Sequence, residues 1–152
     1  MIDAGTVFDF CRWLARAGWL ILLLSLFMPK ARPMAWPTTQ FVLPAILCAA
    51  YLLLVAMGFA TLREIGYAAF SSLGGLRSLY ADDGAIAASW VHFLAFDLFA
   101  GTWMVRDGLA RRMPVALIFL CLPFTYLLGP SGLLLYILLR YALHRRAPPE
   151  TA

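Results

Sequence analysis

Long runs of apolar residues, separated by short charged segments, dominate the pattern along the chain. No charged residue occurs from Pro33 to Leu62 or from Met113 to Leu139, and the run from Ala85 to Val105 contains one acid and one histidine. A helix needs about 20 apolar residues to cross about 30 Å of hydrocarbon at 1.5 Å per residue. Each run meets that length, so the pattern predicts three membrane-spanning helices.

A fourth apolar run, from Trp13 to Met28, follows an amphipathic stretch near the N-terminus. If Arg12 and Arg16 snorkel or face protein, the helix begins near Val7 and reaches spanning length. The run could also be the core of a signal peptide, but no Ala-x-Ala cleavage site follows it. We expect an all-α, polytopic membrane protein, a four-helix bundle whose last helix is kinked or broken. Its spans are predicted near residues 8–28, 41–61, 86–105 and 114–140.

The connections between the spans differ in length and character. Pro29–Pro33 and Arg106–Arg112 are predicted to be short basic loops, because proline cannot continue a helix and charges avoid the hydrocarbon. Residues 62–85 mix serine, glycine and aspartate pairs with apolar residues, which indicates a partly helical segment at the membrane interface. We expect one domain over residues 1–146 and a disordered tail over 147–152.

Composition excludes several other classes of protein. Apolar residues make up 63% of the chain and charged residues 13%, whereas soluble domains carry about 25% charged residues. Disordered chains need the opposite balance, and three cysteines without a CxxC motif do not indicate a disulfide scaffold. The net charge is +4, and the basic residues stand at the ends of the apolar runs. In these positions they can contact anionic lipid headgroups, so we expect no nucleic-acid partner.

The basic residues also bear on orientation. Four spans would leave both termini and the middle connection on one side, with seven Lys and Arg residues there against five on the other. The positive-inside rule then favours, by a narrow margin, cytoplasmic placement of both termini.

Asp97 lies near the middle of the third predicted span. An aspartate at that depth costs about 2.5–3.5 kcal/mol on insertion scales, so it should face protein or water, and it is a candidate functional residue. Arg12 and Arg16 are the candidate ion-pair partners, since the other spans have no basic residue in their interior. The alternative is a structural role, as an interhelical hydrogen-bonding group or half of an ion pair.

His92 precedes Asp97 by five residues, which places the two side chains about 140° apart on a helix. They could line one cavity from its two edges, or His92 could be an ordinary hydrogen-bonding residue. No cysteine or glutamate stands at ligand spacing from His92, so we expect no metal site.

Two prolines and two glycines interrupt the last span between Pro123 and Gly132. They break the helix and leave carbonyls without donors, and irregular backbone at membrane depth is tolerated only where it is buried or lines a cavity. Thr125, Tyr126 and Ser131 could repair these bonds. The break could also open a pocket against the third helix, close to Asp97.

Aromatic residues recur along the third span. Tryptophans of this kind suit the interface belts of membrane proteins. The alternative is a groove for a flat or rod-shaped apolar ligand such as a polyene. The aromatic residues concerned are Trp90, Phe93, Phe96, Phe99 and Trp103.

Three stretches together carry a resemblance to a known family. They are Phe70–Tyr80, Trp90–Asp107 with its WxHxxxxD pattern, and Pro123–Tyr136 with its GPxGLL pattern. The chain resembles the neoxanthin-synthase-like membrane proteins, named from the abscisic-acid-deficient-four protein of plants. That family is implicated in making neoxanthin from violaxanthin, an isomerisation that opens a 5,6-epoxide and generates an allene.

The resemblance implies a cofactor-free isomerase acting on a carotenoid or a similar apolar lipid. Asp97 in its protonated form would be the general acid and His92 the base. From the aromatic stripe and the helix break, we expect the substrate-binding residues to be Trp90, Phe93, Phe96, Trp103, Tyr126, Gly129 and Pro130.

The start of the chain has no features of a plastid transit peptide, so we expect a bacterial member in the inner membrane. The expected partners are membrane lipids, a carotenoid ligand, enzymes of a pigment pathway and a second copy of the chain. One alternative function is non-enzymatic, as a carotenoid- or lipid-binding or assembly protein. Another is a small proton-linked transporter subunit that uses Asp97 as a relay.

Overall fold

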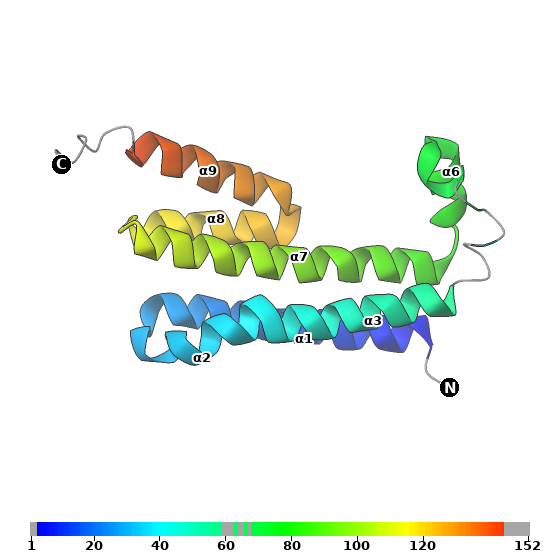
Figure 1. Ribbon diagram of the computed structural model, residues 1–152, viewed down its shortest axis with the longest axis horizontal. Helices are drawn as coiled ribbons and strands as arrows, with labels where there is room; N and C mark the ends of the chain where they lie inside the picture. Colours follow the sequence, from blue (N-terminus) through cyan, green and yellow to red (C-terminus); the bar gives the residue numbers. More distant parts are fainter. Residues whose placement is uncertain (1–2, 59–62, 64–65, 67, 145–152) are drawn as a thin grey trace. The chain divides into compact units, whose positions relative to one another are not determined.

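The computed structural model describes residues 3–58, 63, 66 and 68–144, and this part of the chain is helical without strands (Figure 1). Within it, three helical segments are long and apolar enough to cross a membrane. They are α1 (Ala4–Phe27), the run Pro29–Met57 and α7 (Asp83–Ala110). The predicted all-α membrane-protein class is confirmed.

The chain divides into two compact units, each of which includes part of α1 and part of α7. The first unit comprises Met1–Ala17 and Val42–Phe96, and the second comprises Gly18–Phe41 and Asp97–Ala152. Small residues dominate the α7 side of the first unit's core, which lets neighbouring helices approach closely. That core contains Val7, Cys11, Ala15, Leu47, Leu54, Ala87, Ala88, Val91, Leu94 and Ala95.

The second long segment is built from four successive pieces: η1 (Pro29–Ala31), α2 (Arg32–Pro37), the π-turn η2 (Thr38–Val42) and α3 (Leu43–Met57). The π-turn directly follows Pro37, which cannot donate a backbone hydrogen bond. The hydroxyls of Thr38 and Thr39 donate to the carbonyls of Met34 and Ala35, at 2.7 and 2.9 Å. These bonds satisfy backbone acceptors in the disturbed turn.

The helix therefore begins earlier than residue 41, where the second span was predicted to start. The predicted loop Pro29–Pro33 is a 3₁₀ turn that passes directly into α2. Arg32 explains the compact connection, since its Nε and Nη2 donate to the carbonyls of Ser25 and Leu26 at 3.0 and 3.1 Å. A cation at the end of α1 is favoured by the helix dipole.

The second predicted loop, Arg106–Arg112, is also shorter than expected, because α7 continues to Ala110. Asp107 and Arg111 stand one helical turn apart, and Nε of Arg111 lies 2.9 Å from Oδ1 of Asp107. Such i, i+4 pairs stabilise a helix. At the other end, Oδ1 of Asp82 accepts a hydrogen bond from the Ala85 amide at 2.9 Å and caps the first turn of α7.

The predicted break of the last helix is confirmed at Gly129, between α8 (Val115–Leu128) and α9 (Pro130–His144). The two helices pack against each other as an antiparallel hairpin, drawn from yellow to red in Figure 1. Tyr136 of α9 donates a hydrogen bond to Asp107, near the end of α7, at 2.6 Å.

The predicted span over residues 114–140 contains these two helices, and its crossing of the membrane stays a prediction. At 14 and 15 residues, each helix is roughly 22 Å long, less than the hydrocarbon thickness. α9 returns toward the C-terminal end of α7 (Figure 1), where Tyr136 contacts Asp107.

In the middle connection the structure describes two short helices, α5 (Ala68–Ser71) and α6 (Leu73–Leu79), as a partly helical segment requires. Ser72 caps α6 by accepting the Gly75 amide at 3.0 Å. Residues 59–61 of the second predicted span and the predicted disordered tail lie outside the described residues.

Candidate functional site

Asp97 begins the second unit's part of α7, and its side chain is half-buried. Its carboxylate lies against the backbone of Gly129, because a Cβ built on Gly129 would be only 2.9 Å from Oδ1 of Asp97. Among the described residues, no hydrogen bond or ion pair to this carboxylate is recorded. The acid is therefore packed, half-buried, at the break between α8 and α9.

Glycine is required at position 129 both by its backbone conformation and by the lack of space for a side chain. Its φ of 44° and ψ of −96° lie in a region that glycine adopts without steric cost, and the Asp97 carboxylate occupies the space of a side chain. The Gly129 amide donates to the Thr125 carbonyl at 2.9 Å and closes the last turn of α8. Because Gly129 directly precedes α9, Asp97 lies close to a helix N-terminus, where the dipole favours an acidic group.

Trp19 packs against α7 at Gly101 in the second unit, and its side chain is 5% exposed. A Cβ on Gly101, one turn after Asp97 on α7, would lie 2.6 Å from the Trp19 ring, so the contact requires glycine. The ring of Tyr126 meets Trp19 edge-on, with centroids 5.6 Å apart. Nε1 of Trp19 is buried and has no hydrogen-bond partner in the described part of the chain, so the cluster leaves a donor unused.

His92 belongs to the first unit, where it lies in a cluster of aromatic rings. It stacks on Phe96 with centroids 4.6 Å apart, and the rings of Tyr51 and Phe93 lie at 5.9 Å. The histidine is exposed, as are Trp90, Phe93 and Phe96 at 52–58%. This face of α7 presents flat rings outward and suits contact with apolar chains.

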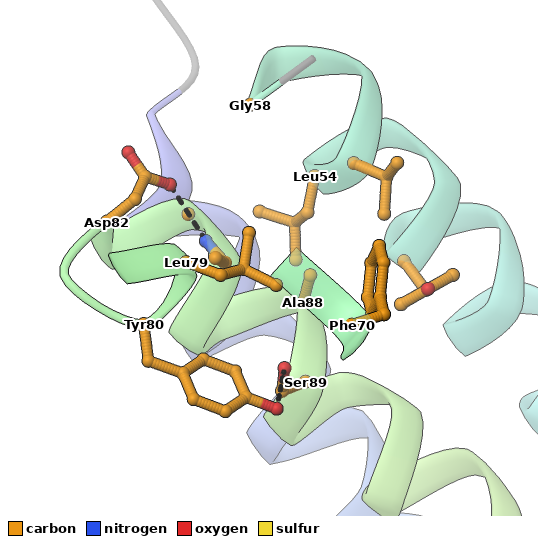
Figure 2. Close-up of a pocket in the computed structure, with 12 residues that line it drawn as sticks. Leu54, Gly58, Phe70, Leu79, Tyr80, Asp82, Ala88 and Ser89 are labelled. Carbon is orange, nitrogen blue, oxygen red and sulfur yellow. Dashed lines mark hydrogen bonds between the residues drawn. The ribbon is translucent and has the colours of Figure 1, made fainter. Parts of the chain in front are cut away.

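Tyr51 connects this aromatic cluster to a cavity of about 120 Å³ in the first unit (Figure 2). The cavity lies among α3, α5, α6 and α7 and is mostly apolar. Its polar groups are few: the Ser89 hydroxyl donates to the Tyr80 hydroxyl at 3.2 Å, and Asp82 caps α7 beside them. Sequence reasoning missed this cavity, although Asp82 in its wall is recognisable from the sequence as a helix-start residue.

The other predicted site residues have separate surroundings. The ring of Trp103 meets that of Tyr136 edge-on at 5.6 Å, and Pro130 is exposed at the start of α9. Arg12 pairs with Asp9 at 2.7 Å, and the guanidinium of Arg16 lies 4.7 Å from the Trp13 ring centroid. Their pairing with Asp97 stays a prediction.

The buried polar contacts of α7 were also missed. Thr102 donates to Thr39 at 2.9 Å, and both side chains are fully buried. Arg106 donates to the side-chain oxygen of Gln40 on the π-turn. A signal for these contacts was available, since polar residues within apolar spans usually bind other helices.

No group of three or more metal-ligating side chains occurs within the described residues. What the described helices define is a multi-pass helical membrane protein with a half-buried acid at a broken helical hairpin. The sequence profile of the ABA DEFICIENT 4-like family matches residues 6–136, and the chain belongs to this family. No curated protein and no solved structure matches the chain.

Proposed function

We propose that the protein is a cofactor-free isomerase that opens the epoxide of a carotenoid or a similar apolar lipid in the membrane. The observation that carries the proposal is the Asp97 carboxylate packed against Gly129, without a recorded partner in the described part of the chain. Membership of the ABA DEFICIENT 4-like family supports this reaction class.

The proposed reaction needs one acid and one base. Asp97 in its protonated form delivers a proton to the epoxide oxygen as the C–O bond breaks, and neutral His92 removes a proton from the adjacent polyene carbon. The product is an isomer of the substrate, so no oxidant, reductant or water is consumed. The hydrocarbon of the membrane around the exposed face of α7 at His92 would exclude the water that otherwise converts the cationic intermediate to a diol.

The aromatic side chains would orient the substrate. In the first unit, Trp90, Phe93 and Phe96 offer an exposed row of rings for a polyene. In the second unit, the Trp19 indole N–H is buried without a partner among the described residues and suits an oxygen atom of a ligand. In the second unit, the proposed substrate-binding residues are Tyr126, Gly129 and Pro130 at the hairpin and Trp103 on α7.

The test is expression of the full chain in a host that accumulates an epoxycarotenoid. Chromatography and mass spectrometry should detect an allenic isomer of unchanged mass. Asp97→Asn and His92→Gln should each lower its formation by roughly 10²-fold or more, because general acid–base catalysis contributes at least that factor. Asp83→Asn, an exposed change on the same helix, is the matched control and should leave the rate unchanged.

Equal conversion by the parent, Asp97→Asn and His92→Gln would contradict both catalytic roles. A parent that copurifies with pigment but forms no isomer would favour the second candidate, a carotenoid-binding or assembly protein. The exposed rings of Phe93 and Phe96 favour that candidate. Replacing both with alanine should then lower bound pigment, whereas Phe41→Ala, an equally exposed ring in the second unit, should not.

We also propose an orientation that follows from three crossings and a returning hairpin. In that arrangement the ends of α1 and α7 share a side with the C-terminus. Six basic residues of the described part of the chain would lie there: Lys30, Arg32, Arg106, Arg111, Arg112 and Arg140. Four would lie opposite: Arg12, Arg16, Arg63 and Arg77. The positive-inside rule then favours a cytoplasmic C-terminus and an external N-terminus. Reporter fusions at each end test this, and a cytoplasmic signal from both would contradict it.

A further inference from the structure

A network of charged and polar side chains joins the C-terminal end of α7 to α9 in the second unit. Its centre is Asp107, which accepts the hydroxyl of Tyr136 at 2.6 Å. Nε of Arg111 lies 2.9 Å from both carboxylate oxygens, and Nε of Arg140 lies 3.4 Å from Oδ2. Tyr136 is fully buried, so it fixes the carboxylate from the protein side and the arginines hold it from the other.

The network contains more guanidinium groups than carboxylates among the contacts of the described residues. Two guanidinium groups, those of Arg111 and Arg140, face the Asp107 carboxylate. Arg140 also lies over the Trp103 ring, with its guanidinium carbon 6.0 Å from the centroid. Among the described residues, Arg140 forms its ion pair with Asp107 through Nε. The N–H groups of its two terminal nitrogens can therefore donate hydrogen bonds to a ligand.

A cavity of about 290 Å³ opens beside the network and is lined by Arg111, Ile137, Arg140 and Tyr141. The two arginines of the network therefore also form the cavity wall. A guanidinium presents parallel N–H donors that match the oxygens of a phosphate group. Basic pockets between membrane helices are a known means of holding phospholipid headgroups.

We propose that this cavity binds a phosphate group and that Arg140 is its principal donor. Asp107 and Tyr136 position the arginines and do not contact the ligand. The apolar Ile137 in the same wall suits a phosphate diester carried by an anionic membrane lipid. Inorganic phosphate offers the same anionic oxygens without the acyl chains, so the experiment includes both sources.

The test uses the full chain purified in detergent and supplied with phosphatidylglycerol, phosphatidylcholine or inorganic phosphate. Native mass spectrometry measures retained lipid, and thermal unfolding measures stabilisation by each additive. Arg140→Gln should lower phosphatidylglycerol retention about fivefold, the effect of one basic side chain near an anionic surface. Arg140→Lys keeps the charge but loses the planar guanidinium group, so its phosphatidylglycerol retention should lie between those of the parent and Arg140→Gln. Arg77→Gln, an exposed arginine of α6, is the control and should retain as much as the parent.

The results distinguish a phosphate group of a membrane lipid from inorganic phosphate, and they test whether Arg140 binds either one. Stabilisation by phosphatidylglycerol alone supports a lipid headgroup, and equal stabilisation by inorganic phosphate supports a phosphate site filled from water. Equal retention by the parent, Arg140→Gln and Arg140→Lys would overturn the proposal. An equal loss in Arg77→Gln would also overturn it, because retention would then follow total charge. Unchanged unfolding of Arg140→Gln without additive would exclude a purely structural role.

Discussion

The two halves of α7 have opposite surroundings. In the first unit its buried face is made of small residues such as Ala87, Ala88 and Ala95, and its outer face presents exposed rings around His92. In the second unit its buried face carries Gly101 and Thr102, and Asp97 packs on the hairpin turn. One continuous helix thus offers an apolar, ring-lined surface in one half and polar contacts to irregular backbone in the other.

This difference has a physical origin. A polar side chain within a membrane helix is stabilised where a neighbour offers polar groups or a helix end. The second unit supplies both, through the π-turn after Pro37 and the break at Gly129. In the first unit, by contrast, α3 and α7 are unbroken at His92, so its ring interactions are mainly with other rings. We therefore expect substitutions in the second unit to have larger effects on stability.

The largest effect is expected for Gly129→Ala. The added Cβ forces an unfavourable backbone conformation and approaches Oδ1 of Asp97 to 2.9 Å, so the loss should be about 2–4 kcal/mol. Unfolding of the purified protein in detergent measures it. Gly74→Ala, in α6 with its nearest neighbour atom at 3.9 Å, is the control and should change little. If Asp97→Ala does not relieve part of the Gly129→Ala loss in a double-mutant cycle, the contact is not the cause.

Gly101→Ala should have the next largest effect. Its Cβ would lie 2.6 Å from the Trp19 ring, which is buried and further held by Tyr126. Overpacking of this kind costs about 1–3 kcal/mol. The same unfolding measurement applies, and near-ultraviolet circular dichroism should report the displaced indole. Gly5→Ala, in the first turn of α1 with ordinary contact distances, should be neutral. An unchanged Trp19 signal in Gly101→Ala would show that the ring does not pack there.

How far the sequence predicts this molecule depends on the kind of feature. The apolar runs predict the long helices, and Pro130 with its flanking glycines predicts the break, because both follow from the local chemistry of the backbone. The hairpin could not be predicted in this way. A kinked span and a returning hairpin have the same apolar composition, and the contact of Tyr136 with Asp107 joins residues far apart in the chain.

The same limit applies to the candidate site. The depth of Asp97 in its span singled it out, and the structure adds its packing on Gly129. The unused N–H of Trp19 could not be predicted, because a tryptophan in a span is most simply assigned to an interface belt. The first-unit cavity depends on how α5 and α6 fold over α3 and α7, which no local pattern records.

An intermediate effect is expected for Thr102→Val. The substitution keeps the shape of the side chain but removes the buried hydrogen bond to Thr39 at 2.9 Å. Interhelical hydrogen bonds in membrane proteins contribute about 0.6 kcal/mol on average and up to about 1.7 kcal/mol. Thr38→Val, whose hydroxyl bonds within its own helix, is the matched control and should lose less. Equal losses in the two variants would show that the contact between α7 and η2 contributes nothing of its own.

The smallest effect is expected for His92→Leu, in the first unit. His92 is exposed and contacts Tyr51, Phe93 and Phe96 by ring faces and edges. A leucine keeps apolar contact with these rings, so unfolding should shift by less than about 1 kcal/mol. If the variant forms less isomer while its stability is unchanged, the histidine acts on a ligand. A loss of stability as large as that of Gly101→Ala would mean that the ring cluster holds the first unit together, and the contrast between the two halves of α7 would then be wrong.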